Sequence, residues 1–311
     1  MKVAHILVVI AAIASVRCAS SPSGKPAPPA ASRTSGVITI RGTSHPYLIE
    51  GTGVTCIIVG PAPQYARAFS DRLKQHLRLV YVDFKQSWNA ESDAGADANM
   101  DTLVDEVDQV RRALGLDRIC VLGHSAAGII ALEYAARHAA LTTHVIVIGT
   151  PPFLGAALGK ARTEFWDSDA SPERKAAYER NKQRLPDDVL KTLSPRDAFA
   201  MRYVRTGPKY FYDASYDYAG AWLGQRLATE LVLRFVGLEF DPRPRLASNT
   251  APVLVLLGRY DYAVPYPLWD GIEDRIPHVT RRRLERSGHF PMLEEPAAFD
   301  DAIIRWLEAA R

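Results

Sequence analysis

Short apolar runs alternate with segments of helical spacing along most of this chain, and this alternation limits the possible folds more than any other feature. Residues 54–59 are almost continuously apolar and end at Gly60, which is typical of a strand buried on both faces. Residues 100–114 instead place Val107 and Leu114 on one side, as an amphipathic helix does. Strands separated by helices pair in parallel, because the helix carries the chain back across the sheet. The sequence therefore predicts an α/β fold with a mostly parallel central sheet and helices on both faces.

The predicted strands share a short apolar core next to a turn residue. They are residues 37–41, 47–50, 54–59, 79–83, 118–122, 144–148, 252–257 and 279–284. The predicted helices share apolar residues that are three or four positions apart. They are residues 65–77, 100–114, 126–138 and 297–307. No strong strand pattern occurs between residues 153 and 247, so we predict a helical cap inserted after the sixth strand.

This pattern gives a domain organisation for the 311 residues of the chain. Residues 37–152 and 248–311 are predicted to form one α/β core, which residues 153–247 interrupt as the cap. Residues 21–36 precede the core, are rich in Pro, Ala and Ser, and are predicted to be a disordered linker.

The first segment, residues 1–20, has the pattern of an export signal. Lys2 gives a positive start, an almost wholly apolar stretch follows, and Ala12 and Ala14 form a small-residue cleavage pattern. The apolar stretch is too short to span a bilayer as a helix of the mature protein. We therefore expect an exported protein, periplasmic or secreted, without a transmembrane span. The alternatives are a lipid anchor on Cys18 and a buried N-terminal strand or helix.

The charge balance argues against nucleic acid or an anionic membrane as a partner. The formal net charge is +3, with 38 basic and 35 acidic residues. Lys2 and Arg17 lie in the predicted export signal, which leaves 36 basic residues against 35 acidic ones. A balance so close to neutral supplies little of the attraction that such partners need. We expect a small-molecule substrate, and the sequence makes no prediction about the oligomeric state.

Cysteine usage gives no indication of a metal site. Only Cys56 and Cys120 lie outside the predicted export signal, and both fall in apolar, strand-like runs. They form a disulfide in an oxidising compartment or are two small buried residues in adjacent strands, and the second interpretation is preferred. Because the sequence has no CxxC pair and no Cys/His cluster, no structural zinc is expected.

A serine stands between a predicted strand and a predicted helix. Residues 118–122 lead into the sequence Gly-His-Ser-Ala-Ala-Gly at 123–128, with Ser125 at the apex. This arrangement is typical of a nucleophile elbow, whose sharp turn needs small residues two positions before and after the serine. Gly123 and Ala127 meet that need, although glycine is usual at the second position. The alternative is an ordinary strand-to-helix turn with Ser125 near the helix N-terminus.

Asp261 and His289 complete the residues that a nucleophilic serine requires. A serine hydroxyl needs an adjacent base, and the base needs an orienting acid. Asp261 follows the predicted strand 252–257, and His289 follows the strand 279–284, in the order expected after Ser125. Each residue follows a strand, so all three are predicted to meet at the C-terminal edge of the sheet. Taken singly, Asp261 is also compatible with a turn and His289 with a surface loop.

Other acids and histidines suit these roles less well. Asp270 and Asp274 lie in a segment of helical character, and Glu285 falls at the last predicted strand. His144 and His278 lie at the starts of strands, which places them at the opposite edge of the sheet.

Residues 37–311 resemble the α/β-hydrolase superfamily at three places: residues 121–128, 257–261 and 287–296. The resemblance implies the α/β-hydrolase fold with a helical cap, and hydrolysis of an ester or amide through an acyl-enzyme, without a metal or organic cofactor. The exported form and the cap are similar to the esterase-like and proline-iminopeptidase-like groups of that superfamily.

Two backbone N–H groups are expected to stabilise the oxyanion. One is the N–H of Ala126, which follows the nucleophile, and the other comes from the loop after residues 54–59. That loop reads Gly-Pro-Ala-Pro at 60–63, where the family usually has His-Gly. Because proline has no N–H, Ala62 is the predicted second donor, and Gln64 is the alternative.

The predicted function is cleavage of a carboxylic ester, or an amide, by Ser125, His289 and Asp261. A proline-iminopeptidase-like aminopeptidase is the first alternative, although the elbow differs from the Gly-Gly-Ser-Trp-Gly form of those enzymes. Its substrate amine would require acidic residues in or near the cap; the candidates are Glu164, Asp213, Asp217 and Glu239. A second alternative is a non-enzymatic ligand-binding protein on a hydrolase fold.

Overall fold

The computed structural model describes residues 33–60, 62–82, 84, 99–216, 238–247 and 249–310. The chain divides into two units, Met1–Ala30 and Ala31–Arg311, and the fold below belongs to the second. The predicted export signal, Cys18 and most of the predicted linker lie outside the described residues.

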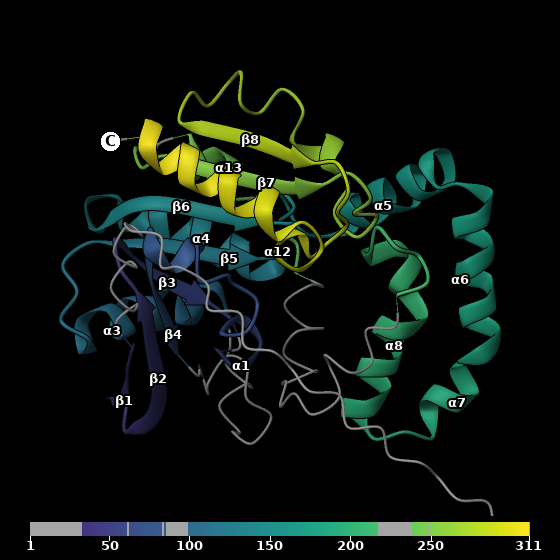
Figure 1. Cartoon of the computed structure of the whole chain (residues 1–311), viewed down its shortest axis with the longest axis horizontal. Coiled ribbons are helices and arrows are strands. Elements are labelled where there is room, and N and C mark those ends of the chain that lie inside the picture. Colours follow the sequence, from purple (N-terminus) through teal and green to yellow (C-terminus); the bar gives the residue numbers. More distant parts are fainter. Residues whose placement is uncertain are drawn as a thin grey trace, which may run out of the picture. The chain divides into compact units, whose positions relative to one another are not determined.

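One eight-stranded sheet forms the centre of this unit, in the order β1-β2-β4-β3-β5-β6-β7-β8 (Figure 1). Strands β1 and β2 are antiparallel to each other, β2 is antiparallel to β4, and every other pair is parallel. The strands are β1 Arg33–Ile40, β2 Thr43–Gly51, β3 Val54–Val59, β4 Leu77–Val82, β5 Ile119–His124, β6 Thr142–Ile148, β7 Val253–Gly258 and β8 Val279–Leu284. The prediction of a mostly parallel sheet is confirmed.

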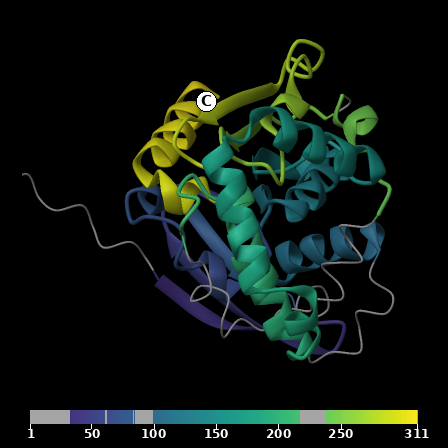
Figure 2. The same cartoon turned by 90° about the vertical axis from the view of Figure 1, so that its right-hand side faces the viewer.

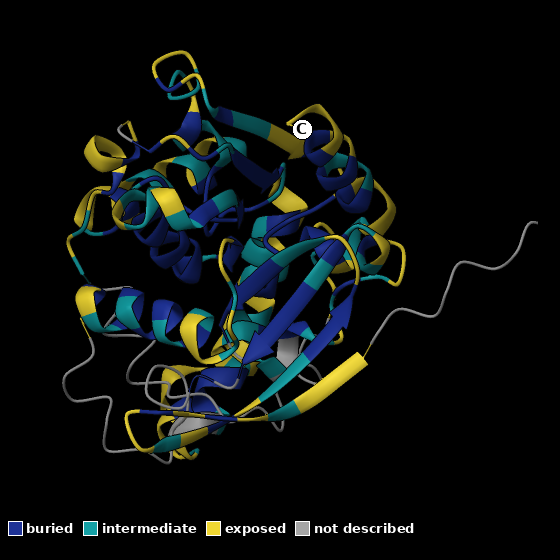
Figure 3. Ribbon diagram, turned by 90° about the vertical axis from the view of Figure 1, so that its left-hand side faces the viewer, coloured by how far each residue is buried: buried dark blue, intermediate teal, exposed yellow. Residues whose placement is uncertain are grey.

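Two layers of helices cover the sheet, because its inner strands are apolar on both faces. Successive residues of one strand join different apolar clusters: Ile57 lies in one cluster, and Ile58 lies in the other. The first cluster packs against α3 (Met100–Ala113) and α4 (Ala126–Arg137), and the second against α13 (Pro296–Ala309). Figure 3 shows the inner strands as buried and the start of β1 as exposed.

Helices follow β6 where a cap was predicted, and we call the helices between β6 and β7 the cap. Within the described residues they are α5 Ala156–Asp169, α6 Pro172–Arg184, α7 Asp187–Lys191, α8 Pro195–Tyr210 and α11 Arg243–Leu246. In Figures 1 and 2, α6 and α8 stand beside the edge of the sheet at which the parallel strands end. The cap therefore lies over the edge where the candidate site residues were predicted.

The prediction of one helix over residues 65–77 is wrong. The chain forms a single helical turn, α1 (Ala62–Tyr65), then turns, and then a short 3₁₀ helix, η1 (Leu73–Gln75). Leu73 is fully buried, and Leu77 is the buried first residue of β4, so their spacing reflects burial in one apolar cluster and not a continuous helix. Ser70 Oγ accepts a hydrogen bond from the N–H of Leu73, the first residue of η1, at 3.0 Å, so this N–H has a partner outside the helix.

Smaller differences concern the ends of elements. The first strand begins at Arg33, inside the stretch predicted as linker, because residues 33–36 pair with β2. Asp270 follows a short 3₁₀ helix, η4 (Tyr266–Trp269), and lies with Asp274 in turns and not in a helix. Glu285 lies just beyond β8, and His144 lies inside β6.

The two cysteines are neighbours in the sheet. Cys56 of β3 and Cys120 of β5 are register partners, both are free and fully buried, and their Sγ atoms are 2.8 Å apart. The preferred interpretation, two buried residues in adjacent strands, agrees with this arrangement.

Candidate active site

Ser125 occupies a strained turn between β5 and α4. Its backbone has φ +56° and ψ −130°, which a residue with a side chain rarely adopts, and its N–H donates to Ile148 O at 2.8 Å. A Cβ atom at Gly123 would overlap the backbone of Ala127, and one at Gly128 would overlap Thr150 Oγ1. Gly123 is therefore required by the turn itself and Gly128 by the segment that follows β6. The turn has the conformation that a nucleophile elbow needs.

Asp261 and His289 form a buried hydrogen-bonded pair. His289 Nδ1 lies 2.7 Å from Asp261 Oδ2, and the side chains are 3% and 0% exposed. Asp261 Oδ1 accepts hydrogen bonds from the N–H groups of Ala263 at 2.9 Å and Val264 at 2.8 Å. A carboxylate only accepts, so Nδ1 of His289 carries the proton in this bond, and Nε2 of the neutral ring can act as a base.

The elbow and the pair meet at one edge of the sheet. The ring of His124, directly before Ser125, lies 4.7 Å from the ring of His289. A Cβ atom at Gly149, directly after β6, would lie 3.0 Å from His289 Nδ1 and 3.2 Å from Asp261 Oδ2. Among the hydrogen bonds of the described residues, none joins Ser125 to His289. A hydrogen bond between a nucleophile and its base is often long without substrate and tightens in the substrate complex.

His124 connects three segments of the site. Its Nε2 lies 2.8 Å from the carbonyl oxygen of His289, and its Nδ1 lies 2.9 Å from the hydroxyl of Tyr65. Burial, together with the neighbouring His289, holds the pKa of His124 well below its usual value, so the ring stays neutral. A carbonyl only accepts, so Nε2 carries the proton and Tyr65 donates to Nδ1. The sequence did not predict these hydrogen bonds of His124, because no local sequence pattern indicates them.

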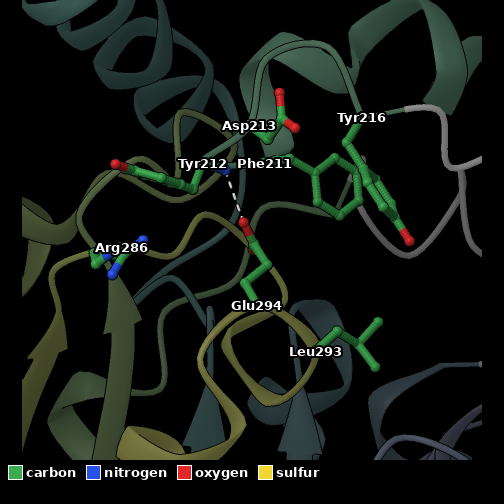
Figure 4. A pocket seen from close by; sticks show the side chains of 7 residues that line it. All are labelled: Phe211, Tyr212, Asp213, Tyr216, Arg286, Leu293 and Glu294. Carbon is green, nitrogen blue, oxygen red and sulfur yellow. Dashed lines mark hydrogen bonds between the residues drawn. The ribbon is translucent and has the colours of Figure 1, made fainter.

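Glu294 holds the loop that carries His289. We call residues 285–290 the base loop and residues 259–264 the acid loop. Glu294 Oε1 accepts the N–H of Gly288 at 3.0 Å and of Phe290 at 3.2 Å, and Oε2 accepts the N–H of Tyr212 at 2.7 Å (Figure 4). Burial raises the pKa of Glu294 to about 7, although these hydrogen bonds oppose the shift. The sequence placed Glu294 only as a residue before the last helix.

The predicted oxyanion donors stand at the starts of helices. Ala126 is the first residue of α4, so its N–H has no acceptor within that helix. Ala62 is the first residue of α1, at the edge where β3 ends. Pro61 lies outside the described residues, so the loop before Ala62 is not described in full.

A cavity of about 200 Å³ lies beside the base loop, which contributes Arg286 to its lining. Its lining comes from the segment after α8 and from the region of Glu294, and none of Ser125, Asp261 and His289 belongs to it (Figure 4). The lining residues are Phe211, Tyr212, Asp213, Tyr216, Arg286, Leu293 and Glu294.

The described part of the chain was searched for metal-binding clusters and for membrane-spanning helices. It contains no group of three or more His, Cys, Asp or Glu residues placed to hold a metal ion. None of its helices is both long enough and apolar enough to cross a membrane.

Comparison with known proteins gives consistent matches. A family model described as alpha/beta hydrolase fold matches residues 70–296. The AB hydrolase superfamily protein YclE of Bacillus subtilis (strain 168) is 34% identical over 278 residues, which cover 88% of this chain and 98% of that protein. A proline iminopeptidase of Heyndrickxia coagulans is 26% identical over 222 residues, 64% of this chain and 70% of that protein. The solved structure of an esterase (EaEST) from Exiguobacterium antarcticum matches with a TM-score of 0.62 at 19% identity, covering 88% of this chain and 100% of its own, and shows a shared fold.

Proposed function

This chain belongs to the α/β-hydrolase family, and from that premise we propose that it is a serine hydrolase that cleaves a carboxylic ester, or less readily an amide, through an acyl-enzyme. The observation that carries the proposal is the buried pair of His289 and Asp261, whose geometry leaves Nε2 of the imidazole free as a base. The pair lies at the same edge as Ser125, which stands in a strained elbow.

The proposed reaction uses these groups in sequence. His289 Nε2 removes the proton of the Ser125 hydroxyl as Ser125 Oγ attacks the carbonyl carbon, and Asp261 stabilises the resulting imidazolium. The N–H groups of Ala126 and Ala62 stabilise the oxyanion. His289 then gives the proton to the leaving alcohol or amine, and a water activated by the same imidazole releases the acid from Ser125.

An ester is preferred over a substrate with an N-terminal amine, because the acidic residues that would bind the amine already have other partners or are exposed. Asp213 accepts hydrogen bonds from the backbone and hydroxyl of Ser215, Glu239 accepts one from Ala156 N, and Glu164 is exposed beside Lys160. Carboxylates that already serve the protein's own donors offer a poor site for a substrate amine. The fourth candidate, Asp217, lies outside the described residues.

A fluorophosphonate probe and two substrate panels test the proposal. Wild type should be labelled, Ser125→Ala should not, and the matched control Ser168→Ala, at an exposed serine of α5, should label as wild type does. A series of p-nitrophenyl acyl esters should be hydrolysed faster than aminoacyl-naphthylamides. Equal labelling of Ser125→Ala would reject the nucleophile, and turnover of the naphthylamides alone would favour the aminopeptidase.

Export remains a separate proposal. It is supported by the sequence pattern of residues 1–20 and is tested by the mass of the protein recovered from the cell envelope or the medium of a bacterial host. A mature chain that still begins at Met1 would contradict it.

A further inference from the structure

The end of α8 lies between the acid loop and the base loop. The N–H of Tyr262 donates to Lys209 O at 3.0 Å, and the N–H of His289 itself donates to Tyr210 O at 2.6 Å. The last residues of one cap helix thus accept backbone hydrogen bonds from both loops that carry the proposed acid and base.

Side chains and close backbone contact reinforce this position. A Cβ atom at Gly288 would overlap the carbonyl group of Tyr210, so the base loop needs glycine where the cap touches it. The ring of Tyr210 meets the ring of His289 edge-on at 5.2 Å, and Phe211 stacks on Phe290 at 5.3 Å. The imidazole of His289 is therefore packed against the cap as well as against the core.

Arg174 of α6 secures the end of α8. Its side chain is largely buried, and its guanidinium donates to Pro208 O at 2.8 Å, to Phe211 O at 2.6 Å and to Tyr212 O at 2.6 Å. Carbonyl groups at a helix C-terminus lack partners within the helix and carry the negative end of its dipole. Pro208 lies in the last turn of α8, and Phe211 and Tyr212 directly follow the helix. One planar guanidinium reaches all three carbonyl groups, which an ammonium cannot do with the same geometry.

The same guanidinium also faces the acid loop. Its Cζ lies 5.1 Å from the ring centroid of Tyr260 and 5.5 Å from that of Tyr262, the two residues beside Asp261. At the end of α5, Asp169 forms a bidentate pair with Arg259 at 2.9 and 2.7 Å and accepts the hydroxyl of Tyr262 at 2.9 Å. The cap thus holds the residues on both sides of Asp261.

We infer that Arg174 is a positioning residue for catalysis: by fixing residues 208–212 between the acid and base loops, it sets the geometry of Asp261 and His289. The inference rests on the proposed function, because positioning has an effect only if these residues do the chemistry. It makes the cap a structural part of the catalytic site in addition to any role as a cover.

Arg174→Met is the direct test, with Arg174→Lys as the conservative variant. The matched control is Arg205→Met, because Arg205 of α8 also donates to a cap carbonyl, Leu185 O at 3.3 Å, and pairs with Asp187 within the cap. The measurements are kcat and KM on a p-nitrophenyl ester, the rate of fluorophosphonate labelling, and Tm.

Arg174→Met should lower kcat and the labelling rate by roughly 10- to 100-fold with little change in KM, because misplacing a catalytic group by about 1 Å costs on that order. A looser Asp261–His289 bond stabilises the imidazolium less, so the acidic limb of the pH–rate profile should move to lower pH. Arg174→Lys should recover part of the loss, and Arg205→Met should lower Tm without changing kcat by more than about twofold.

The inference is wrong if Arg174→Met lowers kcat no more than Arg205→Met does, or changes only KM. If Arg174→Met does not fold, Arg174→Lys replaces it, because it keeps the charge but cannot donate to the three carbonyl groups with the same geometry; an unchanged kcat and pH profile in that variant would then overturn the inference. An unlabelled wild type would instead reject the proposed function, so the two failures differ.

Discussion

At the scale of single residues, the Asp261 carboxylate determines which nitrogen of His289 is protonated. One oxygen accepts two backbone N–H groups, from Ala263 and Val264, and the other faces His289 Nδ1. Both oxygens therefore have a fixed role as acceptors. The role of Asp261 can therefore be tested by Asp261→Asn, which replaces one carboxylate oxygen with an NH₂ group.

Asp261→Asn should lower kcat by about 10⁴-fold. Its amide oxygen must stay with the two backbone N–H groups, so its NH₂ would face His289 Nδ1 and force the proton onto Nε2, where it blocks the base. The variant should fold, and steady-state kinetics beside Tm measure the effect. A loss of less than about tenfold would show that Asp261 does not orient the base.

Glu294 should make stability depend on pH. Burial raises its pKa from 4.5 to about 7, so the folded state binds more protons than the unfolded chain between those values. Its contribution to the free energy of unfolding is therefore largest below pH 4.5 and falls as the pH rises towards 7. Urea unfolding at several pH values should show wild type losing stability relative to Glu294→Gln across this window. Parallel curves for the two proteins would contradict the assignment.

The residues that the sequence predicted share one property: each belongs to a local pattern. Ser125 stands between a strand and a helix, and Asp261 and His289 each follow a strand in the expected order. Arg174 and Glu294 have no such pattern, because their function depends on carbonyl and N–H groups distant in the chain. Only the folded backbone brings those partners together.

At the scale of elements, buried strands were predicted well and the segment after β3 was not. A strand inside a parallel sheet is apolar on both faces, so its sequence alone indicates it. The four-residue spacing of Leu73, which precedes β4, and Leu77, which begins it, came from burial in one apolar cluster and resembles the spacing of a helix. The same segment carries Tyr65, whose hydroxyl hydrogen-bonds to His124. The wrong prediction therefore concerned a segment that contacts the candidate active site.

Tyr65→Phe tests the connection between α1, the elbow and the base loop. Without the hydroxyl, Nδ1 of the buried His124 ring is left as an acceptor without its donor, which weakens the position of the ring that donates to the His289 carbonyl. We expect a several-fold lower kcat and a loss of about 1 kcal/mol in the free energy of unfolding. Tyr134→Phe is the matched control, because that buried hydroxyl contacts Asp108 at 3.3 Å, among helices α3 and α4. Equal effects on kcat would rule out a specific role for Tyr65.

At the scale of the whole Ala31–Arg311 unit, the core and the cap are joined through backbone hydrogen bonds at the site itself. Lys209 and Tyr210 of α8 accept the N–H groups of Tyr262 and His289, and Tyr212 donates to Glu294. Opening of the cap at this point would break the support of both loops. We therefore expect residues 208–212 to exchange with solvent as one unit with the acid and base loops.

Hydrogen exchange measures this coupling directly. In Arg174→Met, peptides covering residues 208–212, 259–264 and 285–290 should exchange faster by a common factor, because one opening exposes them all. Peptides from α3 should be unchanged, since this helix packs against β1, β3 and α4. Phosphonylation of Ser125 by the fluorophosphonate probe, in which Oγ bonds to phosphorus and fluoride leaves, should leave α3 unaffected as well. Faster exchange in residues 208–212 alone would mean that the base loop holds its shape without the cap, and that Arg174 stabilises only the end of α8.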